Sequence, residues 1–249
     1  MADLKIEYVE SDVRHSVLWE SHCHAQYEMI AVVDGDITVM LEGQRYRLQS
    51  NRVLIIPPLL YHSVMANGEG SYHRVTALFG SDTIPKELRD SFVSQGRSAK
   101  CPSHQLEKMK KICQKREDAF YAPLLHSLMV EILYDTLQAP AELVGAETDA
   151  FLQKALSYID VHLHEKILLD DLARATNRSK SSFCHLFEEK MKISPKQYIL
   201  QKKLALADKL IAEGMPRTLV ATQLGYENYS NFYRLCLKRS EAGLPKRKP

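Results

Sequence analysis

The chain has 249 residues, enough for one large domain or two smaller ones at roughly 100–200 residues per domain. With 45% hydrophobic and 26% charged residues, it is neither collagen-like nor wholly disordered. No apolar run approaches the roughly 18–20 residues of a membrane helix, and the first residues lack the basic and apolar segments of a secretory signal, so we expect a cytoplasmic protein that does not bind membranes. Its five cysteines are widely spaced and form no CxxC motif, which predicts reduced thiols.

The net charge of +2 conceals two parts of opposite charge. Residues 1–149 carry 15 Lys and Arg against 21 Asp and Glu, a net charge of −6, whereas residues 150–249 carry 18 against 10, a net charge of +8. Lys and Arg replace the counterions that surround phosphates, so a basic segment favours binding to nucleic acid. A basic surface that is merely solvated is the alternative. The asymmetry predicts two domains with different partners.

The first hundred residues predict a small β-barrel. Runs of β-forming residues are separated by turn-forming dipeptides such as Asp34-Gly35 and Glu42-Gly43. Short strands at this spacing are typical of a sandwich or barrel, and a small closed barrel can hold one ligand. The expected strands cover 27–33, 37–41, 46–48, 53–56 and 72–79.

Three histidines and one glutamate in this region form a candidate ligand site. His22 and His24 alternate along one strand and so share a face, and Glu28 has the same parity. If His62 lies on a neighbouring strand, the four groups converge inside the barrel as a ligand set that suits a divalent metal such as Zn, Ni, Fe or Mn. A metal-free ligand pocket and purely structural histidines are the alternatives, and no other cofactor is expected. The predicted effector pocket comprises Trp19, His22, His24, Tyr27, Glu28, Tyr61 and His62.

These positions resemble the two motifs of the cupin family. The pattern HxHxxxE, followed by a glycine after six further residues, matches the first motif at every named position. Pro57, five residues before His62, matches part of the second motif. Asn51 and Leu59 stand where that motif usually has Gly, and Ala66 stands where it usually has Asn. The resemblance implies a cupin-like barrel with the candidate metal site inside it.

Residues 103–138 change to a helical period. After Pro123, apolar residues repeat at positions i, i+1, i+4 and i+5, which predicts a helix with one apolar stripe. Such a stripe packs into the core of its own chain or against a second copy, and we expect this segment to support a homodimer. Residues 139–149 have no sustained period and are interpreted as a linker between a sensor barrel at 1–100 and a DNA-binding domain at 150–249.

The last hundred residues predict two helix-turn-helix units joined by a long helix. In the first unit, Asn177 suits the turn and Ser179 suits the N-cap of the second helix. In the second unit, Gly225 and Asn228 occupy the corresponding places. The second helix of such a unit enters the major groove of DNA. A preceding helix is expected at 151–164, the two units at 169–187 and 220–238, and the joining helix at 195–213.

This duplicated pattern resembles the C-terminal DNA-binding domain of the AraC/XylS transcription regulators. The resemblance covers residues from about 151 to 245 and rests on the stretches LARATNRSKSSFCHLFEEKMKISPKQYI and VATQLGYENYSNFYRLCLK. Together with the cupin-like first part, it implies a one-component regulator of double-stranded promoter DNA, controlled by a small effector in the barrel. RNA polymerase is a further expected partner. Several positions depart from the family pattern; among them, Lys192 replaces a usual Gly, Lys203 a usual Arg and Cys236 a usual Phe.

The resemblance implies two recognition helices in successive major grooves. Arg234 is the strongest base-reading candidate, because an Arg can donate two hydrogen bonds to one guanine. Lys196, Lys202 and Arg239 are expected near phosphates, together with Lys180 and Lys238. The predicted DNA-binding residues are Lys180, Ser181, Ser182, Cys184, His185, Tyr229, Ser230, Asn231, Arg234 and Lys238.

The sequence therefore predicts an α+β multidomain protein with an N-terminal cupin-like β-barrel, following helices, and a C-terminal all-α double helix-turn-helix domain. The predicted function is sequence-specific regulation of transcription, and no residue is assigned a catalytic role. The alternative is a metal-dependent cupin enzyme, an oxygenase or isomerase, fused to a DNA-binding module.

Overall fold

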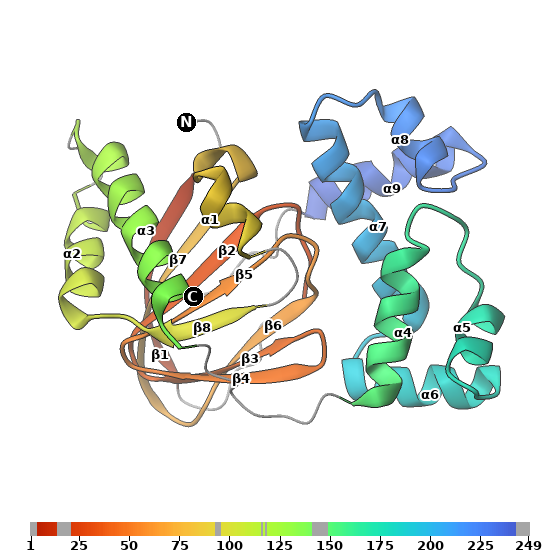
Figure 1. Ribbon diagram of the computed structural model, residues 1–249, viewed down its shortest axis with the longest axis horizontal. Coiled ribbons are helices and arrows are strands. Elements are labelled where there is room, and N and C mark those ends of the chain that lie inside the picture. Colours follow the sequence, from red (N-terminus) through yellow and green to blue (C-terminus); the bar gives the residue numbers. More distant parts are fainter. Residues whose placement is uncertain are drawn as a thin grey trace.

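The computed structural model describes residues 4–13, 21–92, 96–115, 117, 119–140 and 149–242. The chain forms two lobes that lie side by side, a β-rich lobe followed along the chain by an all-helical one (Figure 1). The predicted fold class, an α+β protein with an N-terminal barrel and a C-terminal helical region, is confirmed. Among the described helices, none combines the length and the apolar character needed to cross a membrane.

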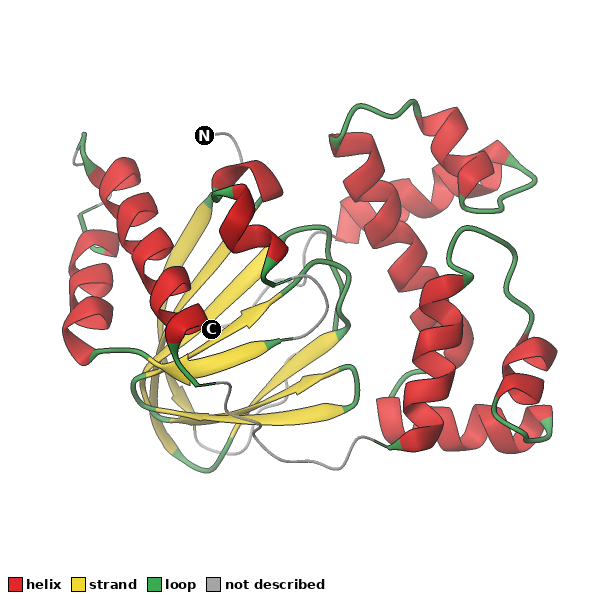
Figure 2. Ribbon diagram, viewed as in Figure 1, coloured by secondary structure: helices red, strands yellow, loops and turns green. Residues whose placement is uncertain are grey.

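The described strands form two antiparallel sheets, drawn in yellow in Figure 2. One sheet has the strand order β1-β7-β2-β5-β8 and the other has the order β4-β3-β6. Ile30 and Ile56 from the first sheet share an apolar cluster with Val39 and Leu48 from the second, so the sheets pack face to face as a flattened barrel. The strands are β1 (Lys5–Val13), β2 (Tyr27–Asp34), β3 (Asp36–Leu41), β4 (Gln44–Gln49), β5 (Arg52–Ile56), β6 (His62–Ala66), β7 (Gly70–Phe79) and β8 (Arg97–Lys100).

Three of these strands, β1, β6 and β8, lie outside the ranges that the sequence predicts. Strands β1 and β8 are the two edges of the larger sheet, each paired with a single neighbour. Their sequences, KIEYVESDV and RSAK, are rich in charged residues, which natural proteins place on edge strands to prevent further pairing. A search for apolar alternation therefore misses such strands.

Helices cover the outer face of the larger sheet. Met29 of β2 and Val75 of β7 point away from the barrel interior and share an apolar cluster with Leu106. The covering helices are α2 (Ser103–Cys113) and α3 (Tyr121–Gln138), which Figure 1 shows against the sheet. The 3₁₀ helix η1 (Ser81–Thr83) and helix α1 (Lys86–Asp90) lie between β7 and β8 along the chain.

The second lobe consists of helices α4 to α9. Residues 141–148, most of the predicted linker before it, lie outside the described part of the chain. The helices are α4 (Ala150–Val161), α5 (Leu169–Ala175), α6 (Lys180–Met191), α7 (Pro195–Ala212), α8 (Arg217–Gln223) and α9 (Tyr229–Ala242).

The two helix-turn-helix units share one backbone geometry. In the turn between α5 and α6, the backbone N–H of Arg178 donates to the carbonyl oxygen of Ala173 over 2.9 Å. In the turn between α8 and α9, the backbone N–H of Tyr226 donates to the carbonyl oxygen of Ala221 over 2.9 Å. Ala173 and Ala221 are both buried, which lets the two helices of each unit cross closely.

Each turn contains one residue with a left-handed backbone. Asn177 has φ 55° in the first unit and Gly225 has φ 74° in the second. A Cβ atom on Gly225 would lie only 2.8 Å from the carbonyl carbon of Glu165, so the second turn requires glycine for space as well as for conformation.

The two lobes contact each other directly. Cys23 and Tyr61 of the barrel lie in the same apolar cluster as Leu152 of α4 and Tyr198 of α7. The turn between β3 and β4 also reaches α4, because a Cβ atom on Gly43 would lie 2.6 Å from Cδ1 of Leu152. The helical lobe is therefore docked on the barrel through a continuous apolar core.

Candidate metal centre and nucleic-acid interface

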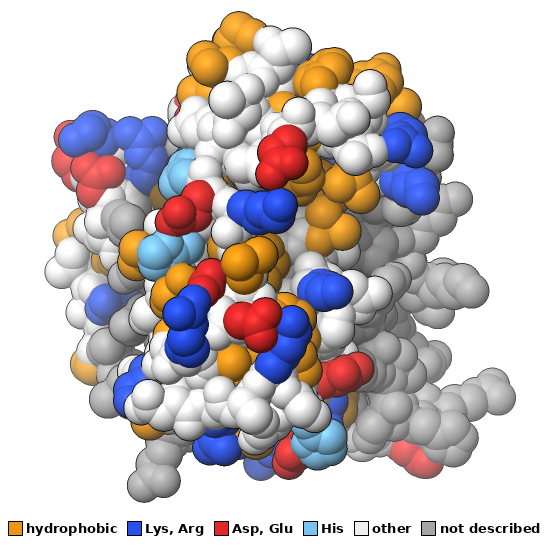
Figure 3. All heavy atoms as spheres, turned by 90° about the vertical axis from the view of Figure 1, so that its right-hand side faces the viewer, with side chains coloured by type: hydrophobic (Ala, Val, Ile, Leu, Met, Phe, Trp, Pro, Cys, Tyr) orange, Lys and Arg blue, Asp and Glu red, His pale blue; other side chains and the backbone are white. Residues whose placement is uncertain are grey.

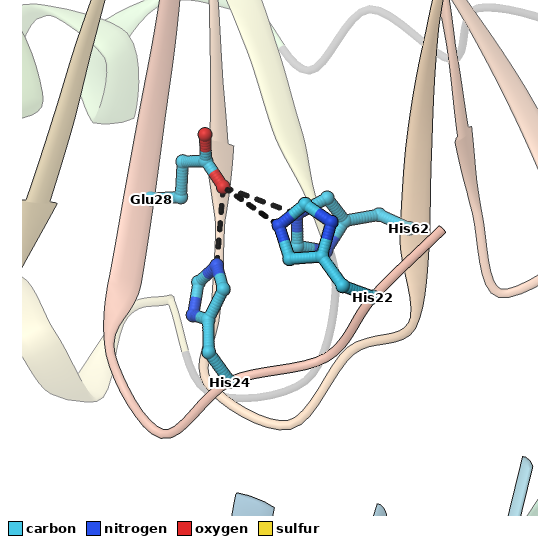
Figure 4. Close-up of side chains that lie close together, drawn as sticks. All are labelled: His22, His24, Glu28 and His62. Atoms are coloured by element: carbon cyan, nitrogen blue, oxygen red, sulfur yellow. Dashed lines mark hydrogen bonds and ion pairs between the residues drawn. The ribbon is translucent and has the colours of Figure 1, made fainter. Parts of the chain in front are cut away.

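Three histidines and one glutamate gather where β2 and β6 begin (Figure 4). The Nε2 atoms of His24 and His62 each lie 3.1 Å from Oε2 of Glu28. The Nε2 atom of His22 lies 4.0 Å from the same oxygen. The side chain of His22 is 17% exposed, whereas the side chains of the other three are at most 5% exposed. The structure thus brings together all four residues of the predicted metal site, with His22 on the solvent side.

Backbone contacts determine which nitrogen of two histidines carries a proton. Nδ1 of His24 lies 2.9 Å from the carbonyl oxygen of Gln26, and Nδ1 of His62 lies 2.9 Å from the carbonyl oxygen of Leu60. A carbonyl oxygen only accepts hydrogen bonds, so each Nδ1 must be the donor. In the neutral imidazole, Nε2 is then unprotonated and faces the Glu28 carboxylate with its lone pair. Two such acceptors lie 3.1 Å apart only when a proton or a metal cation joins them.

The arrangement fits a divalent transition metal. Metal–nitrogen and metal–oxygen bonds of about 2.0–2.2 Å place neighbouring ligand atoms roughly 3.0–3.5 Å apart. The candidate ligand atoms here all lie within 4.8 Å of one another, and the two closest pairs are at 3.1 Å. The backbone carbonyls that hold the two Nδ1–H groups provide the outer hydrogen bonds typical of ligating histidines. Three imidazoles and one carboxylate would hold the ion, and His22 gives the site a side open to solvent.

The second cupin motif lacks two of its usual glycines, but the residues in their places adopt the backbone conformation that glycine favours. Asn51 and Leu59 occupy the usual glycine positions and have φ values of 63° and 67°. Both therefore adopt the left-handed conformation that glycine favours, at a cost that the surrounding fold must offset. The backbone N–H of Leu59 donates to the carbonyl oxygen of His24 over 2.9 Å, which places the segment before His62 beside the segment that carries the other histidines.

The other members of the predicted effector pocket do not join this cluster. Tyr27 lies on the opposite face of β2 and stacks on Phe79 with ring centroids 5.5 Å apart, because adjacent strand residues point to opposite faces. Tyr61 points to the helical lobe and contacts the ring of Tyr198. Trp19 lies outside the described residues. The prediction that Tyr27 and Tyr61 line the same pocket as the histidines is therefore wrong.

The first recognition helix, α6, presents most of its predicted residues to solvent. Phe183 and Phe187 are buried and fix the face that packs inward. Ser179 caps the helix by accepting a hydrogen bond from the backbone N–H of Ser182 over 3.3 Å. Cys184 is only half-exposed and packs against the core of the lobe. The exposed candidates on α6 are Lys180, Ser181, Ser182 and His185.

The second recognition helix, α9, has the same organisation. Phe232 is buried, and Asn228 caps the helix by accepting a hydrogen bond from the backbone N–H of Asn231 over 3.2 Å. The predicted residues of α9 are all exposed: Tyr229, Ser230, Asn231, Arg234 and Lys238. Figure 3 shows Lys and Arg side chains spread over the helical lobe together with Asp and Glu, rather than gathered in one patch.

Two residues expected near phosphates face the barrel instead. Lys202 is 2% exposed, and its Nζ lies 3.1 Å from Oε1 of Glu42 and 2.9 Å from Oδ1 of Asp160. Arg239 donates to the carbonyl oxygen of Cys23 over 2.6 Å. Glu42 belongs to a predicted turn, and no local pattern in the sequence reveals its contact with a lysine 160 positions away. Lys196 is exposed on α7.

Comparison with known families decides the kind of protein. Residues 4–155 match the model of the AraC-like ligand binding domain, and residues 172–242 match the model of a helix-turn-helix domain. The chain belongs to the AraC family of transcriptional regulators. As an AraC-family protein, it is a DNA-binding regulator of transcription with a ligand-binding N-terminal domain, and not an enzyme. The alternative of a cupin enzyme fused to a DNA-binding module is thereby set aside.

Several known proteins resemble this AraC-family chain. It is 23% identical over 231 residues to the uncharacterized HTH-type transcriptional regulator YobQ of Bacillus subtilis (strain 168). The aligned region covers 92% of this chain and 88% of YobQ. The probable transcriptional regulator LumQ of Photobacterium leiognathi is 40% identical over 77 residues, 30% of this chain and 31% of LumQ. The structure of unsaturated fatty acid bound ToxT from Vibrio cholerae strain SCE256 aligns with a TM-score of 0.44 at 10% identity, over 96% of this chain and 92% of that one.

Proposed function

We propose that this regulator binds a divalent transition-metal ion in the barrel, between His22, His24, Glu28 and His62, and that the ion is the effector that controls promoter binding. The observation that carries the proposal is the pair of Nε2 atoms, each 3.1 Å from one oxygen of Glu28, while each Nδ1–H is held by a backbone carbonyl. Such a set of acceptors around one point is matched by zinc, nickel, iron or manganese.

The experiment is a measurement of metal content in the full-length protein after removal of any affinity tag. Protein incubated with zinc and then dialysed is analysed by inductively coupled plasma mass spectrometry. We expect one zinc ion per chain in the wild type and in His164→Ala, which replaces an exposed histidine of the helical lobe. We expect loss of zinc in His62→Ala and Glu28→Gln. A wild type that retains no more metal than His62→Ala would contradict the proposal and favour a metal-free effector pocket.

We propose that DNA is read in the cytoplasm by the exposed residues of α6 and α9. Support comes from the shared turn geometry of the two units and from the capped starts of both helices, where Ser179 and Asn228 accept from a backbone N–H of the first turn. Lys180, Ser181, Ser182 and His185 form the proposed contact set of α6, with Cys184 beside it. Tyr229, Ser230, Asn231, Arg234 and Lys238 form that of α9.

We also propose that residues 103–138 form the contact between two copies of the chain. Three apolar side chains at this segment are exposed: Phe120 by 70%, Leu124 by 46% and Tyr134 by 52%. Exposed apolar surface of this kind is typical of a protein interface. Light scattering coupled to size-exclusion chromatography should give a dimer for the wild type and a monomer for Leu124→Glu, and a monomeric wild type would contradict the proposal.

A further inference from the structure

The segments that carry the three histidines run beside each other at the edge of the barrel. The backbone N–H of His22 donates to the carbonyl oxygen of His62, and the N–H of His62 donates to the carbonyl oxygen of His22, both over 2.9 Å. A third backbone hydrogen bond joins Leu59 to His24. The two segments therefore form a short paired ribbon, and alternate residues of a ribbon point to opposite sides. The histidines occupy the side that faces Glu28.

The other side of this ribbon is the surface on which the helical lobe docks. Cys23, between two of the histidines, is 1% exposed, and Tyr61, next to the third, is 6% exposed. Both belong to the apolar cluster of the helical lobe, where the ring of Tyr61 meets that of Tyr198 with centroids 5.4 Å apart. Arg239 of the second recognition helix donates to the carbonyl oxygen of Cys23 over 2.6 Å. Cys23 and Tyr61 are thus each the immediate chain neighbour of a candidate metal ligand.

A polar network, partly buried and centred on Glu42 and Lys202, lies beside the apolar contact. Glu42, in the turn between β3 and β4, accepts hydrogen bonds from the backbone N–H of Tyr61 over 2.9 Å and from the hydroxyl of Tyr198. It also accepts a hydrogen bond from Lys202, which pairs with Asp160 on α4 as well. Burial by itself lowers the pKa of Lys202, but the charges of Glu42 and Asp160 outweigh burial and raise it, so the ammonium stays charged. The network therefore ties α7 to the same segment that carries His62.

We propose that metal binding in the barrel is coupled to the docking of the helical lobe. The ion would bind the inner side of the ribbon, and α7 and α9 contact the outer side of the same ribbon. This inference rests on the proposed function, since it needs an ion on the histidines. An ion bound to both segments at once favours their paired arrangement, and the paired arrangement is the one that presents Cys23 and Tyr61 to the helical lobe. Metal binding thereby stabilises the docked state and holds the second recognition helix through Arg239.

Coupling of this kind is reciprocal, so it can be measured by changing the docking contacts and following the metal affinity. If the ion strengthens docking, weakened docking must lower metal affinity by the same factor. Lys202→Met and Arg239→Gln remove docking contacts on α7 and α9 without touching a metal ligand. Lys209→Met is the matched control, since this lysine lies on α7 and its ion pair is with Glu213 of the helical lobe.

The experiment measures the zinc affinity of the full-length proteins by competition with a fluorescent chelator, with circular dichroism as the check of folding. Typical couplings predict that Lys202→Met and Arg239→Gln each bind zinc about 5–150-fold more weakly than the wild type, whereas Lys209→Met binds zinc as the wild type does. If Lys202→Met does not fold, Arg239→Gln, which loses contacts of a partly exposed side chain, provides the same comparison.

Each outcome separates the two proposals. Zinc binding by the wild type with equal affinity in the folded docking variants would overturn the coupling and leave the metal site intact. A wild type that does not bind zinc would overturn the metal site itself, and the coupling with it. Thiol modification read by mass spectrometry gives a second test: in the wild type, Cys23 should react more slowly with zinc bound than after treatment with a chelator, and equal rates would contradict the coupling.

Discussion

Arg234 donates a hydrogen bond to the side-chain oxygen of Asn231, one turn earlier on the second recognition helix. Its Nε also lies 3.4 Å from the carbonyl oxygen of Ser230. Beside this pair, Tyr229 and Tyr233 stack with ring centroids 6.1 Å apart. The exposed face of α9 therefore presents a guanidinium held by a neighbouring amide, which reduces the side-chain entropy that DNA binding must overcome.

Replacement of Arg234 should change base preference. We expect Arg234→Ala to lose about 1–3 kcal/mol of binding to the preferred duplex and to discriminate less at one base pair, because two hydrogen bonds to a guanine are lost. Fluorescence anisotropy on a duplex selected from a random library, and on its single-base variants, measures both effects. An equal loss on every duplex would show that Arg234 contacts phosphate instead.

Replacement of Lys238 should weaken DNA binding without changing base preference. This lysine is exposed on α9, and a phosphate contact releases roughly one counterion. We expect Lys238→Ala to lower the slope of log affinity against log salt by about one and to bind all duplexes proportionately more weakly. Lys108→Ala on α2, remote from both recognition helices, is the control, and an unchanged salt slope in Lys238→Ala would refute the contact.

Lys203 should contribute to the stability of the second helix-turn-helix unit. Its Nζ donates to the carbonyl oxygens of Glu165 over 2.5 Å and of Leu224 over 2.7 Å, and burial lowers the pKa of this amine. Lys203→Met leaves both carbonyls without this donor, so we expect a loss of about 1–3 kcal/mol in the free energy of unfolding. Lys203→Arg keeps a donor and should lose much less. Urea denaturation compares the variants, and equal stabilities would contradict the bracing role.

Local sequence patterns predict the candidate metal site well where residues close in the chain also lie close in space. The sequence correctly brings His22, His24 and Glu28 together, but only Glu28 lies on strand β2, while His22 and His24 lie on the segment that precedes it and pairs with His62 through an isolated bridge. The two-residue period of a strand, applied to Tyr27, places that ring on the opposite face and corrects the predicted pocket. Lys203, at the usual arginine position, keeps a cationic donor with a different side chain. Such features can be predicted from the sequence because they depend on the backbone geometry of only a few consecutive residues.

Asp149 should make stability depend on pH. A hydrogen bond from Lys190, together with the backbone N–H groups of Phe151 and Leu152, holds the pKa of this carboxyl below its usual value. A lowered pKa in the folded state adds stability that is present above the unfolded pKa and is lost as pH falls through the folded value. We expect the stability difference between wild type and Asp149→Asn to be largest near neutral pH and to shrink below about pH 4.

Urea midpoints measured at several pH values between 7 and 3.5 give this comparison. The matched variant Asp149→Ala also loses the helix cap and should cost about 1 kcal/mol at neutral pH. A difference between wild type and Asp149→Asn that stays constant across the range would show that the charge of Asp149 contributes nothing.

Contacts between the lobes are what the sequence does not reveal. Lys202 has the appearance of a DNA-facing lysine, and only the docked arrangement shows that it is buried against Glu42 and Asp160. Arg239 likewise turns to Cys23 of the barrel. These pairs join residues far apart in the chain, and their geometry depends on how two independently patterned lobes meet. Neither helical nor strand periodicity carries that information.

Control of DNA binding by the barrel is tested most directly by the affinity of full-length wild-type protein for its selected duplex, with zinc bound and after treatment with a chelator. We expect the two affinities to differ by at least about fivefold, and we expect the difference to vanish in His62→Ala. Equal affinities of the zinc-bound and chelator-treated wild type, in protein shown to gain and lose the ion, would contradict control by a metal in the barrel.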